Sequence, residues 1–586
     1  MARPVSGKIM EDLVWVKISE NKFYCYHRQR LWRDGQCVTL GKKLLGKSTE
    51  KGGELVPTRA KRPSKKTTEQ SEAQNNPFLD SNKAVTATRK HTGMMDIIEH
   101  VGDISGIDED LYLVTDKPTA EKILSIARYI VATDGASLPG IEEWMLTHSV
   151  PYQHPITEDV YRKLFNEVGR DESLRQGYFK RRFDREEDLA LVIAYDSSTQ
   201  NSETRNPEAR VGMNKEHNGK RAIKILVLYS LTTRQPLAFS KQPANVPDVI
   251  SLENAINQLK AFGVKRVVMV TDGGFSSEEN LAMLLHSSNH SLTRVKLNWR
   301  WVNKELLEHR KELASVARIM PSDVCVKGTT VSVKKTFKYK RTYGSTKKNL
   351  SPGDEDTFEK KIYLHFYSDS AQKEKEDREF FCEIMELKKL LEEGSELSEA
   401  AQKAAETYLH IKRWGHKVTT TLNESAIEEA CQNHGVFALV SDYYKTADEA
   451  LTAYRKREWI ESYFEKFKQQ TDGSTSRTGN PENLMGRLFV QFIAMGYIEK
   501  FYTQIRQMKE NLGVPNGDPK HDTKENLEAE KSLRRWLEER SLPRILKWFD
   551  AYETTEVSRE ITSRRWSTEV ILRDKMFLKR LGMSPI

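Results

Sequence analysis

Two apolar runs, each followed closely by an aspartate, constrain this chain more than any other feature of its sequence. Residues 189–195 lead directly into Asp196, and residues 267–270 lead through one threonine into Asp272. Runs of this length that are apolar throughout are typical of strands buried on both faces of a sheet. We therefore expect two buried strands that end at Asp196 and Asp272.

The segment between these two runs has the pattern of a hairpin followed by a helix. Residues 223–230 and 236–240 are strand-like runs on either side of the turn 232–235, and apolar residues recur at helical spacing over 252–262. The order strand, hairpin, helix, strand predicts an α/β fold with a mixed sheet.

The position of the two aspartates suggests a binding site. In open α/β sheets, such sites form at the carboxyl ends of the strands. If the two strands are neighbours, Asp196 and Asp272 lie side by side, and a divalent cation would relieve the repulsion between their charges. The alternative, that each aspartate only caps its strand, stays open at this point.

The composition excludes several classes of protein. At 586 residues the chain is too long for one core, and its 38% hydrophobic and 30% charged residues are typical of globular domains. No apolar stretch approaches the roughly 20 residues of a membrane span, and the first residues lack the apolar segment of a secretory signal. The five cysteines form no C-x2-C pair, which argues against a zinc ribbon or a disulfide framework. We expect a cytoplasmic protein without a membrane partner.

The charge balance permits nucleic-acid binding without requiring it. The 93 Lys and Arg and the 84 Asp and Glu give a net charge of +9. Positive charge gathers over residues 42–66, beginning with Lys42 and Lys43. Clustered Lys and Arg displace counterions from phosphates, so this stretch is either an arm that contacts DNA or a solvated linker.

Changes of pattern along the chain predict six segments. The first is β-rich and basic, the second has helical periodicity, and a long insertion splits the α/β core. The expected segments are an N-terminal β and basic DNA-binding region at 1–93, a helical and DNA-binding domain at 94–185, a first core part at 186–298, an insertion domain of strands and helices at 299–435, a second core part at 436–480 and a C-terminal helical region at 481–586.

A long helix expected over 447–470 carries a polar stripe. Arg457, Glu461 and Lys468 follow Tyr454 at distances of 3, 7 and 14 residues, which places all four within roughly 60° on one helix. The solvated face of an amphipathic helix, with Arg457 and Glu461 as an i,i+4 ion pair, also explains this stripe.

These four residues fit a Y-x2-R-x3-E-x6-K signature, and the chain resembles the DDE transposases of the insertion-sequence-four-like superfamily. Asn245 and Asp248 before a helix, and the second aspartate motif at 270–275, look similar in order and spacing. The segment 133–135 and the N-terminal strands that end at 53–57 look like the longer members, the insertion-sequence-1634 group. The resemblance covers nearly the whole chain.

Two positions depart from the pattern of this superfamily. The second aspartate motif usually reads Asp-Arg-Gly, but Gly273 replaces the arginine here, which removes a possible contact to phosphate or carboxylate. The segment after Pro481 carries Gly486 and Arg487 where members often have Gly-His. Neither departure removes a candidate metal ligand.

The resemblance implies an RNase H-like catalytic core with Asp196, Asp272 and Glu461 as an acidic triad. Carboxylates are hard oxygen ligands suited to Mg²⁺ or Mn²⁺. Two such ions would support in-line phosphoryl transfer that cuts DNA at the ends of a mobile element, and the freed 3′-hydroxyl would then join new DNA. Arg457 and Lys468 would bind phosphates beside the scissile bond, and Tyr454 would donate a hydrogen bond to a phosphate.

The implied partners are double-stranded DNA with terminal inverted repeats, target DNA and a second protomer, so that a homodimer acts on DNA in the nucleoid. The expected insertion adds candidate DNA contacts, which are Lys338, Lys340, Arg341, Trp299 and Trp301. The basic residues among them alternate with aromatic residues, as in surfaces that combine phosphate contact with base stacking, and the tryptophans could stack on a flipped base. A polar edge strand and ordinary core tryptophans explain these residues as well.

Three functions fit the sequence. The first is an active transposase of a bacterial or archaeal insertion sequence. The second is a DNA-binding protein descended from a transposase that no longer catalyses transfer, and the third is an RNase H-like nuclease that cuts DNA without joining it. Inverted repeats around the coding sequence would favour the first over the second, and joined reaction products would favour the first over the third.

Overall fold

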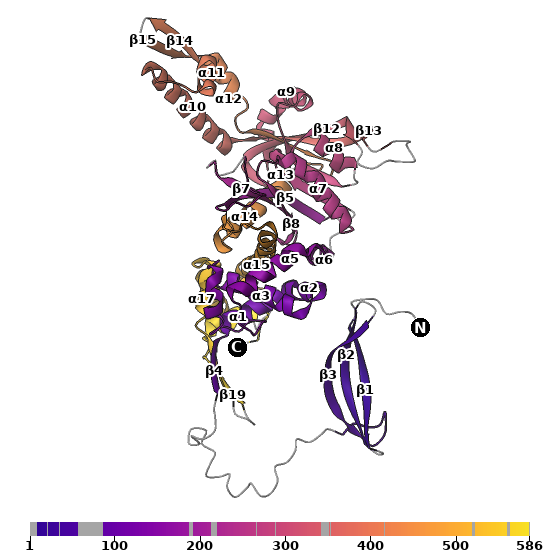
Figure 1. The fold of residues 1–586 in the computed structure, drawn as a ribbon. Helices are drawn as coiled ribbons and strands as arrows, with labels where there is room; N and C mark the ends of the chain where they lie inside the picture. Colours follow the sequence, from indigo (N-terminus) through magenta and orange to yellow (C-terminus); the bar gives the residue numbers. More distant parts are fainter. Residues whose placement is uncertain are drawn as a thin grey trace. The chain divides into compact units, whose positions relative to one another are not determined.

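In the computed structural model the chain divides into two compact units, and Figure 1 labels many of their strands and helices. One unit comprises Met1–Thr88 and Thr555–Trp566, and the other comprises Arg89–Thr554 and Ser567–Ile586. The residues that the structure describes are 9–19, 22–33, 36–56, 86–186, 191–212, 219–264, 266–286, 289–340, 351, 353–414, 417–517, 522–558 and 563–584.

The first unit contains an antiparallel sheet of three consecutive strands, in the order β1-β2-β3. The strands are β1 (Ile9–Ser19), β2 (Lys22–Arg33) and β3 (Gln36–Ser48). Apolar and polar residues alternate over 15–40, which predicts two or three short strands with turns at 20–21 and 34–35. The strands are confirmed, and they begin earlier and run further than this alternation suggests. The turns expected at 20–21 and 34–35 lie outside the described residues.

The second unit is built on a mixed sheet of eleven strands. Its order is β11-β12-β13-β16-β10-β9-β5-β7-β6, with β8 beside β7 and β17 beside β5. The strands are β5 (Leu191–Ser202), β6 (Arg210–Val211), β7 (Arg221–Ser230), β8 (Pro236–Pro243), β9 (Val267–Thr271), β10 (His290–Val295), β11 (Ile319–Met320), β12 (Asp323–Lys340), β13 (Glu355–Asp369), β16 (Val436–Ser441) and β17 (Thr475–Ser476).

Five neighbouring strands have the directions expected for the core. Strands β5, β9 and β10 run parallel, β7 is antiparallel to β5, and β8 is antiparallel to β7. Helix α7 (Asp248–Ala261) connects β8 to β9. The spatial order β8-β7-β5-β9-β10 is consistent with an RNase H-like transposase core. The hairpin around 232–235, the helix after it and the strand before Asp272 are therefore confirmed.

Strand β5 differs from its expectation, because it does not end at Asp196 but continues to Ser202. Its polar second half is buried between two partners. Asn201 lies opposite Ala222 of β7 and also beside Thr475 of β17. Ladder hydrogen bonds to both neighbours satisfy the backbone there, so the strand continues although its residues are polar. Asp196 thus lies in the middle of a strand.

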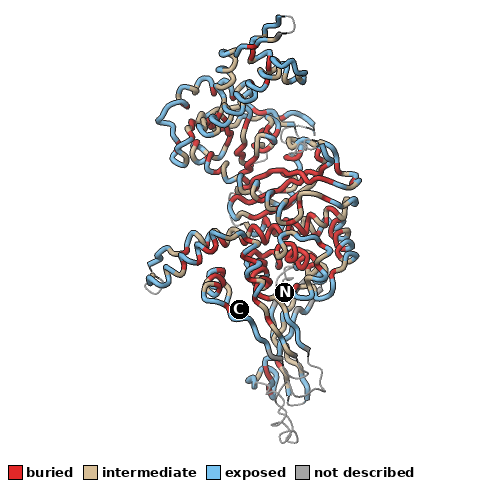
Figure 2. Tube along the Cα trace, turned by 90° about the vertical axis from the view of Figure 1, so that its left-hand side faces the viewer, coloured by how far each residue is buried: buried red, intermediate tan, exposed pale blue. Residues whose placement is uncertain are grey.

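Hydrophobic residues fill both sides of the sheet. The adjacent residues Phe366 and Tyr367 of β13 belong to two different core clusters, and side chains of consecutive strand residues point to opposite faces. Helices α8 (Glu278–His286) and α9 (Arg300–Ala314) contribute to the smaller of these two cores. Figure 2 shows the buried residues of this unit concentrated along the sheet and the helices against it.

Residues 93–184 fold into helices joined by turns, as the periodicity over 94–185 predicts. The helices are α1 (Gly93–Ser105), α2 (Ile107–Val114), α3 (Lys117–Ala132), α4 (Ile141–Trp144), α5 (Glu158–Arg170) and α6 (Glu172–Asp184). The 31-residue helix α15 (Pro481–Asn511) packs against α1, α3 and α5, and its middle is buried almost throughout. A C-terminal helix thereby becomes part of the core of the helical region.

The residues of the expected insertion are partly continuous with the sheet. Strands β12 and β13 form a long hairpin that joins β16. Between β13 and β16 the chain forms α10 (Ser370–Glu392), α11 (Glu399–Tyr408), β14 (Leu409–Trp414), β15 (Lys417–Leu422) and α12 (Glu424–Cys431). The highly charged sequence of about 374–410 predicts a pair of helices, and α10 and α11 confirm it.

The C-terminal residues are mainly helical, as expected, but they also contain two strands. The elements are α16 (Lys524–Glu538), α17 (Leu542–Phe549), β18 (Glu553–Ser558), β19 (Ser563–Ser567) and α18 (Leu572–Leu581). Together with β4 (Thr86–His91), the two strands form a sheet in the order β19-β18-β4. Among the described residues, none of the helices combines the length and the apolar character that crossing a bilayer requires.

Candidate active site

Asp196 is a buried carboxylate in the middle of the central strand β5. Only 4% of the residue is exposed. Its Oδ1 accepts a hydrogen bond of 2.7 Å from the backbone N–H of Ser197, and its Oδ2 lies 3.0 Å from a guanidinium nitrogen of Arg457. A charge this deeply buried is stable only with such partners.

Asp272 follows β9 directly and begins the short 3₁₀ helix Gly273–Phe275. Its Oδ1 accepts a hydrogen bond of 2.6 Å from the backbone N–H of Gly273. Because Tyr195 pairs with Thr271 in the parallel ladder, the next residues, Asp196 and Asp272, lie at the same level on neighbouring strands. Such strands are about 4.8 Å apart, so the backbones of Asp196 and Asp272 are immediate neighbours.

The loop that carries Asp272 is fixed by Asn280 of α8. The Asn280 amide donates hydrogen bonds of 2.8 Å to the carbonyls of Val249 and Phe275, and its backbone N–H donates to the hydroxyl of Ser277. These bonds tie the loop after β9 to the first turn of α7. The segment after the second aspartate motif therefore has a structural role in holding Asp272.

The third candidate acid, Glu461, does not lie on one long helix with Tyr454. The expectation of a single helix over 447–470 is wrong, because α13 (Ala447–Arg455) ends and α14 (Glu458–Gln470) begins between them. At the break, the N–H groups of Arg457, Trp459 and Ile460 donate to the carbonyls three residues earlier. Bonds of this 3₁₀ type tighten the chain locally, and here they mark the boundary between the two helices.

Arg457 lies at this break and connects two of the carboxylates. One terminal nitrogen bonds to Asp196, and the other bonds to Glu461, one turn further along. The Arg457 side chain is only 14% exposed, whereas that of Glu461 is 51% exposed. Burial alone would lower the pKa of Arg457, but Tyr454 and the carboxylates around it outweigh burial and raise the pKa.

Tyr454 and Lys468 complete the expected stripe. The hydroxyl of Tyr454 lies 3.5 Å from Oδ1 of Asp272, at the limit of a hydrogen bond. Burial raises the pKa of Tyr454 to about 12, so its phenol stays protonated at neutral pH. Lys468 is half-buried in the last turn of α14, about two turns beyond Glu461. Tyr454 thus meets the carboxylates through the bend in the chain rather than along a helix face.

The side chains at this site fit a divalent cation by their chemistry. Asp196, Asp272 and Glu461 offer hard carboxylate oxygens, the ligand type that Mg²⁺ and Mn²⁺ prefer. The guanidinium of Arg457 lies between Asp196 and Glu461 and offsets part of their negative charge. The arrangement combines acidic ligands with a planar donor that can also hold a phosphate.

The comparison with protein families shows to which family the chain belongs. A family model described as the transposase DDE domain matches residues 187–496, more than half of the chain. The chain belongs to the DDE transposase family. It is therefore a metal-dependent enzyme that cuts DNA, and DDE transposases generally use divalent metal ions.

The other comparisons add less. Among solved structures, the transposase is similar to a piggyBac transposase in a synaptic complex with hairpin DNA, with a TM-score of 0.33 and 12% sequence identity. That alignment covers 77% of this chain and 81% of the other. The comparison with curated proteins finds no match.

Several predicted DNA contacts of the transposase gather around α8. Trp299 and Trp301 are partly buried against the core, and the indole N–H of Trp301 donates a hydrogen bond of 2.7 Å to Glu278. Lys338 and Lys340 line an open pocket of about 350 Å³ together with residues of α7 and α8. Arg341 lies outside the described residues.

Lys42 and Lys43 are exposed on β3, in the first unit of the transposase. The ammonium of Lys42 lies 4.1 Å from the ring centroid of Tyr26 on the neighbouring strand. These two lysines therefore belong to a β-sheet surface rather than to a solvated linker. The rest of the basic stretch, from residue 57 onward, lies outside the described residues.

The sequence analysis did not consider Arg294, whose guanidinium lies 5.3 Å from the ring centroid of Phe437. Thr293 of β10 pairs with Thr271 of β9, so Arg294 follows at the level of Asp272 on the next strand. Its charge also acts to lower the pKa of Tyr454. The register of the three parallel strands reveals this position, and no pattern in the sequence marks it.

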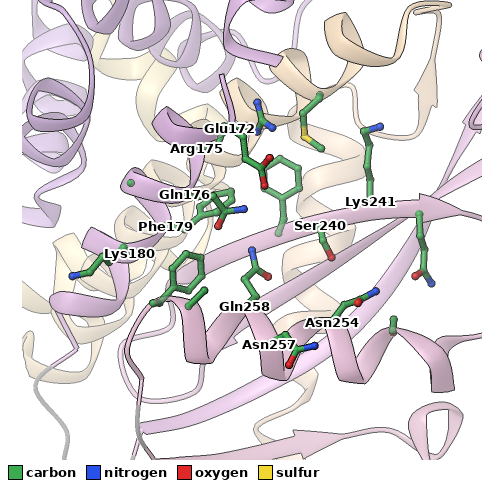
Figure 3. A pocket seen from close by; sticks show the side chains of 17 residues that line it. Glu172, Arg175, Gln176, Phe179, Lys180, Ser240, Lys241, Asn254, Asn257 and Gln258 are labelled. Atoms are coloured by element: carbon green, nitrogen blue, oxygen red, sulfur yellow. The ribbon is translucent and has the colours of Figure 1, made fainter. Parts of the chain in front are cut away.

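A larger open pocket of about 750 Å³ lies elsewhere in the transposase, between α6, β8 and α7 (Figure 3). Amide and charged side chains line it, among them Gln176, Lys241 and Asn254. None of the three candidate carboxylates lines this pocket. It is therefore separate from the candidate active site.

Proposed function

We propose that this transposase belongs to the insertion-sequence-four-like superfamily, nearest the insertion-sequence-1634 group, and moves a bacterial or archaeal insertion sequence. In this proposal it binds terminal inverted repeats, cuts the DNA at the ends of the element and joins them to target DNA. The observation that supports the proposal is the shared level of Asp196 on β5 and Asp272 directly after β9, with Glu461 tied to Asp196 through Arg457.

Asp196, Asp272 and Glu461 are the residues that would hold two Mg²⁺ or Mn²⁺ ions. The bound ions would supply an activated oxygen nucleophile and stabilisation of the leaving oxygen in phosphoryl transfer. The protein contributes a rigid position for each carboxylate. Asp196 is fixed by the ladder of β5, and Asp272 is fixed by the loop that Asn280 holds.

Cationic and polar side chains beside the carboxylates would position the DNA. Arg457 has five N–H donors in a planar fork, so it can hold a carboxylate and a phosphate oxygen together. Tyr454 keeps its proton and can donate to a phosphate, and Lys468 can act as a point charge further along the strand. Each of these groups would help to hold the scissile phosphate beside the three carboxylates.

The predicted DNA contacts away from the acids would bind longer stretches of the element end. Lys338, Lys340 and Arg341 would contact phosphates, and Trp299 or Trp301 would stack on a base near the cut. Lys42 and Lys43 would add phosphate contacts from the first unit. Two ends must be held together during transposition, so we propose a homodimer on DNA, acting in the nucleoid of the cytoplasm.

The first test replaces each acid by its neutral isostere. Asp196→Asn, Asp272→Asn and Glu461→Gln should each reduce Mg²⁺-dependent cleavage of element-end DNA by about a hundredfold or more, because a metal ligand is lost while the shape is kept. Glu465→Gln is a matched control, since Glu465 is exposed one turn further along α14, where it accepts a hydrogen bond from Gln469. This control should cleave at the rate of the unmodified protein.

The products of the same assay separate the three functions. Cleaved ends joined to target DNA support the transposase. Nicks without joined products would indicate a nuclease, and binding of end DNA without any cleavage would indicate a protein that has lost catalysis. Full activity of the Glu461→Gln variant would remove Glu461 from the proposed triad.

A further inference from the structure

The elements between β13 and β16 form a small subdomain with its own core. Ile384 and Leu387 of α10, Ala405 of α11 and Leu409 of β14 are buried together, and this cluster is separate from the cores of the large sheet. We refer to α10, α11, β14, β15 and α12 as the hairpin subdomain. Figure 1 shows β14 and β15 at its outer end, away from the large sheet.

The β14–β15 hairpin has one face on this core and one face in solvent. Leu409 is buried, and Ile411, which shares its face by strand alternation, packs against the same cluster. On the other face, His410, Lys412 and Trp414 are exposed. Trp414 is 75% exposed, which is more than any other tryptophan among the described residues. Its partner strand adds the exposed Thr419 and Thr421, opposite Lys412 and His410.

Charge is strongly segregated within the hairpin subdomain. Residues 370–408 carry eleven Asp and Glu against six Lys and Arg, and residues 423–435 carry three Glu and no Lys or Arg. Residues 409–422, which form the hairpin, carry three Lys and Arg and no acid. A polyanion is therefore repelled by the helices and attracted only to the hairpin.

The basic residues of the hairpin also differ from those of the helices in their partners. On α10 and α11, five of the six basic residues lie within 4.0 Å of an acid four residues away, and these five are Lys373, Lys375, Arg378, Lys389 and Lys403. Within the part of the chain that the structure describes, neither Lys412 nor Arg413 is in an ion pair. Their charge is thus available to an external partner.

We propose that the β14–β15 hairpin is a DNA-binding ribbon that lies in a groove of duplex DNA. A two-stranded ribbon fits the major groove, which is about 12 Å wide. Lys412 and Arg413 contact phosphates, and Trp414 packs its exposed ring against sugars or bases at the groove. The identity of this duplex as element-end or target DNA rests on the proposed function, whereas binding of duplex DNA by the hairpin does not.

The test measures binding of the full-length protein to a 50-base-pair duplex in EDTA, so that cleavage does not contribute. Replacing Lys412 and Arg413 together by Ala should weaken binding about tenfold at 0.1 M salt and reduce the slope of log K against log salt by about 2. Trp414→Ala should weaken binding about three- to tenfold with little change in that slope, because stacking is not a counterion effect.

The matched control removes the same number of charges from the same subdomain. Lys375 and Arg378 are exposed on α10, and replacing both by Ala should leave affinity and salt slope unchanged. Circular dichroism of each variant should match the unmodified protein, since the altered residues lie outside the small core. Equal loss of affinity in the control and the hairpin variant would overturn the proposal, because net charge alone would then explain it.

Two further outcomes are decisive. If the hairpin variants bind duplex DNA as tightly as the unmodified protein but change its oligomeric state, the hairpin is a contact between protomers and the proposal is wrong. If they lose duplex affinity while the unmodified protein shows no cleavage of element ends, the hairpin proposal stands and the proposed transposition fails. A greater loss of affinity for element-end DNA than for unrelated DNA would indicate that the hairpin binds the ends of the element.

Discussion

At the scale of single residues, one guanidinium organises the candidate site. Arg457 bonds to the buried Asp196 and to the half-exposed Glu461, and it lies where two helices meet. A shared cation therefore holds Asp196 and Glu461 near each other. A cation that is already part of the protein offsets their repulsion and fixes Glu461 near the sheet.

Removing this guanidinium should raise the affinity for metal ions but lower the rate of DNA cleavage. Arg457→Gln should tighten Mn²⁺ binding by the isolated protein on the order of three- to tenfold, because a positive charge beside Asp196 is lost. Cleavage of end DNA should fall, because glutamine cannot hold carboxylate and phosphate together. Isothermal titration calorimetry measures the affinity for Mn²⁺, and a cleavage assay measures the activity.

A neighbouring arginine provides the control for this prediction. Arg455 is two residues away on α13 and pairs with Asp323, outside the site. Arg455→Gln should leave Mn²⁺ affinity unchanged. Equal Mn²⁺ affinity of the unmodified protein and the Arg457→Gln variant would mean that Arg457 does not compete for the carboxylates.

At the scale of elements, the helical region depends on the close crossing of α5 and α15. Gly169 of α5 faces the backbone of Glu482, and Gly486 of α15 faces the backbone of Phe165. A Cβ atom at either glycine would overlap a backbone carbonyl of the other helix, so the helices could not approach as they do. The glycine at 486, which is shared with the family pattern, therefore has a packing reason in this chain.

Gly486→Ala should destabilise the protein by about 3 kcal/mol, because two helices must separate to admit one methyl group. Urea unfolding followed by circular dichroism measures this change. Gly177→Ala on α6 is the matched control, since its Cβ would meet only the side chain of Val114, at 3.3 Å. Alanine there should be neutral or slightly stabilising through its helix propensity, and equal destabilisation by both variants would contradict the crossing argument.

At the scale of the whole molecule, the large sheet links the strands of the candidate site to the expected insertion. Strands β16, β13 and β12 extend the sheet beyond β10, so residues between Asp272 and Glu461 share its core. His365 of β13 is fully buried in this extension. Its Nε2 lies 3.2 Å from the carbonyl of Tyr444, which can only accept, and its Nδ1 lies 2.9 Å from the hydroxyl of Thr330. The ring is thus held in its neutral form.

Because of this histidine, the free energy of unfolding should decrease as the pH decreases. Burial lowers the pKa of His365 to about 4, although the bond to Tyr444 acts in the opposite direction. The unfolded chain binds the proton near pH 6.5, so stability is complete above that pH and is lost as pH falls toward 4. The loss between pH 6.5 and pH 5 should be about 2 kcal/mol, and His365→Gln should lack this component. Urea midpoints at both pH values measure it, and an identical pH dependence in the two proteins would refute it.

The sequence by itself determined the local elements and the chemistry available to them. Short, fully apolar runs indicated buried strands, and the spacing of apolar residues indicated the helices of 93–184 and α7. The acidic, basic and aromatic residues of the family signature were likewise visible without a structure. These features depend on short-range periodicity, which a sequence displays directly.

Tertiary structure alone decided how those residues meet. Strand β5 continues past Asp196 because β7 and β17 pair with its polar half. The sequence of 197–202 contains no pattern that predicts this pairing. The helix over 447–470 breaks at Arg457 although its residues are good helix formers, where the guanidinium binds Asp196. The position of Arg294 beside Asp272 follows from strand register. Long-range pairing and burial set these outcomes, and neither is encoded in any one stretch of the chain.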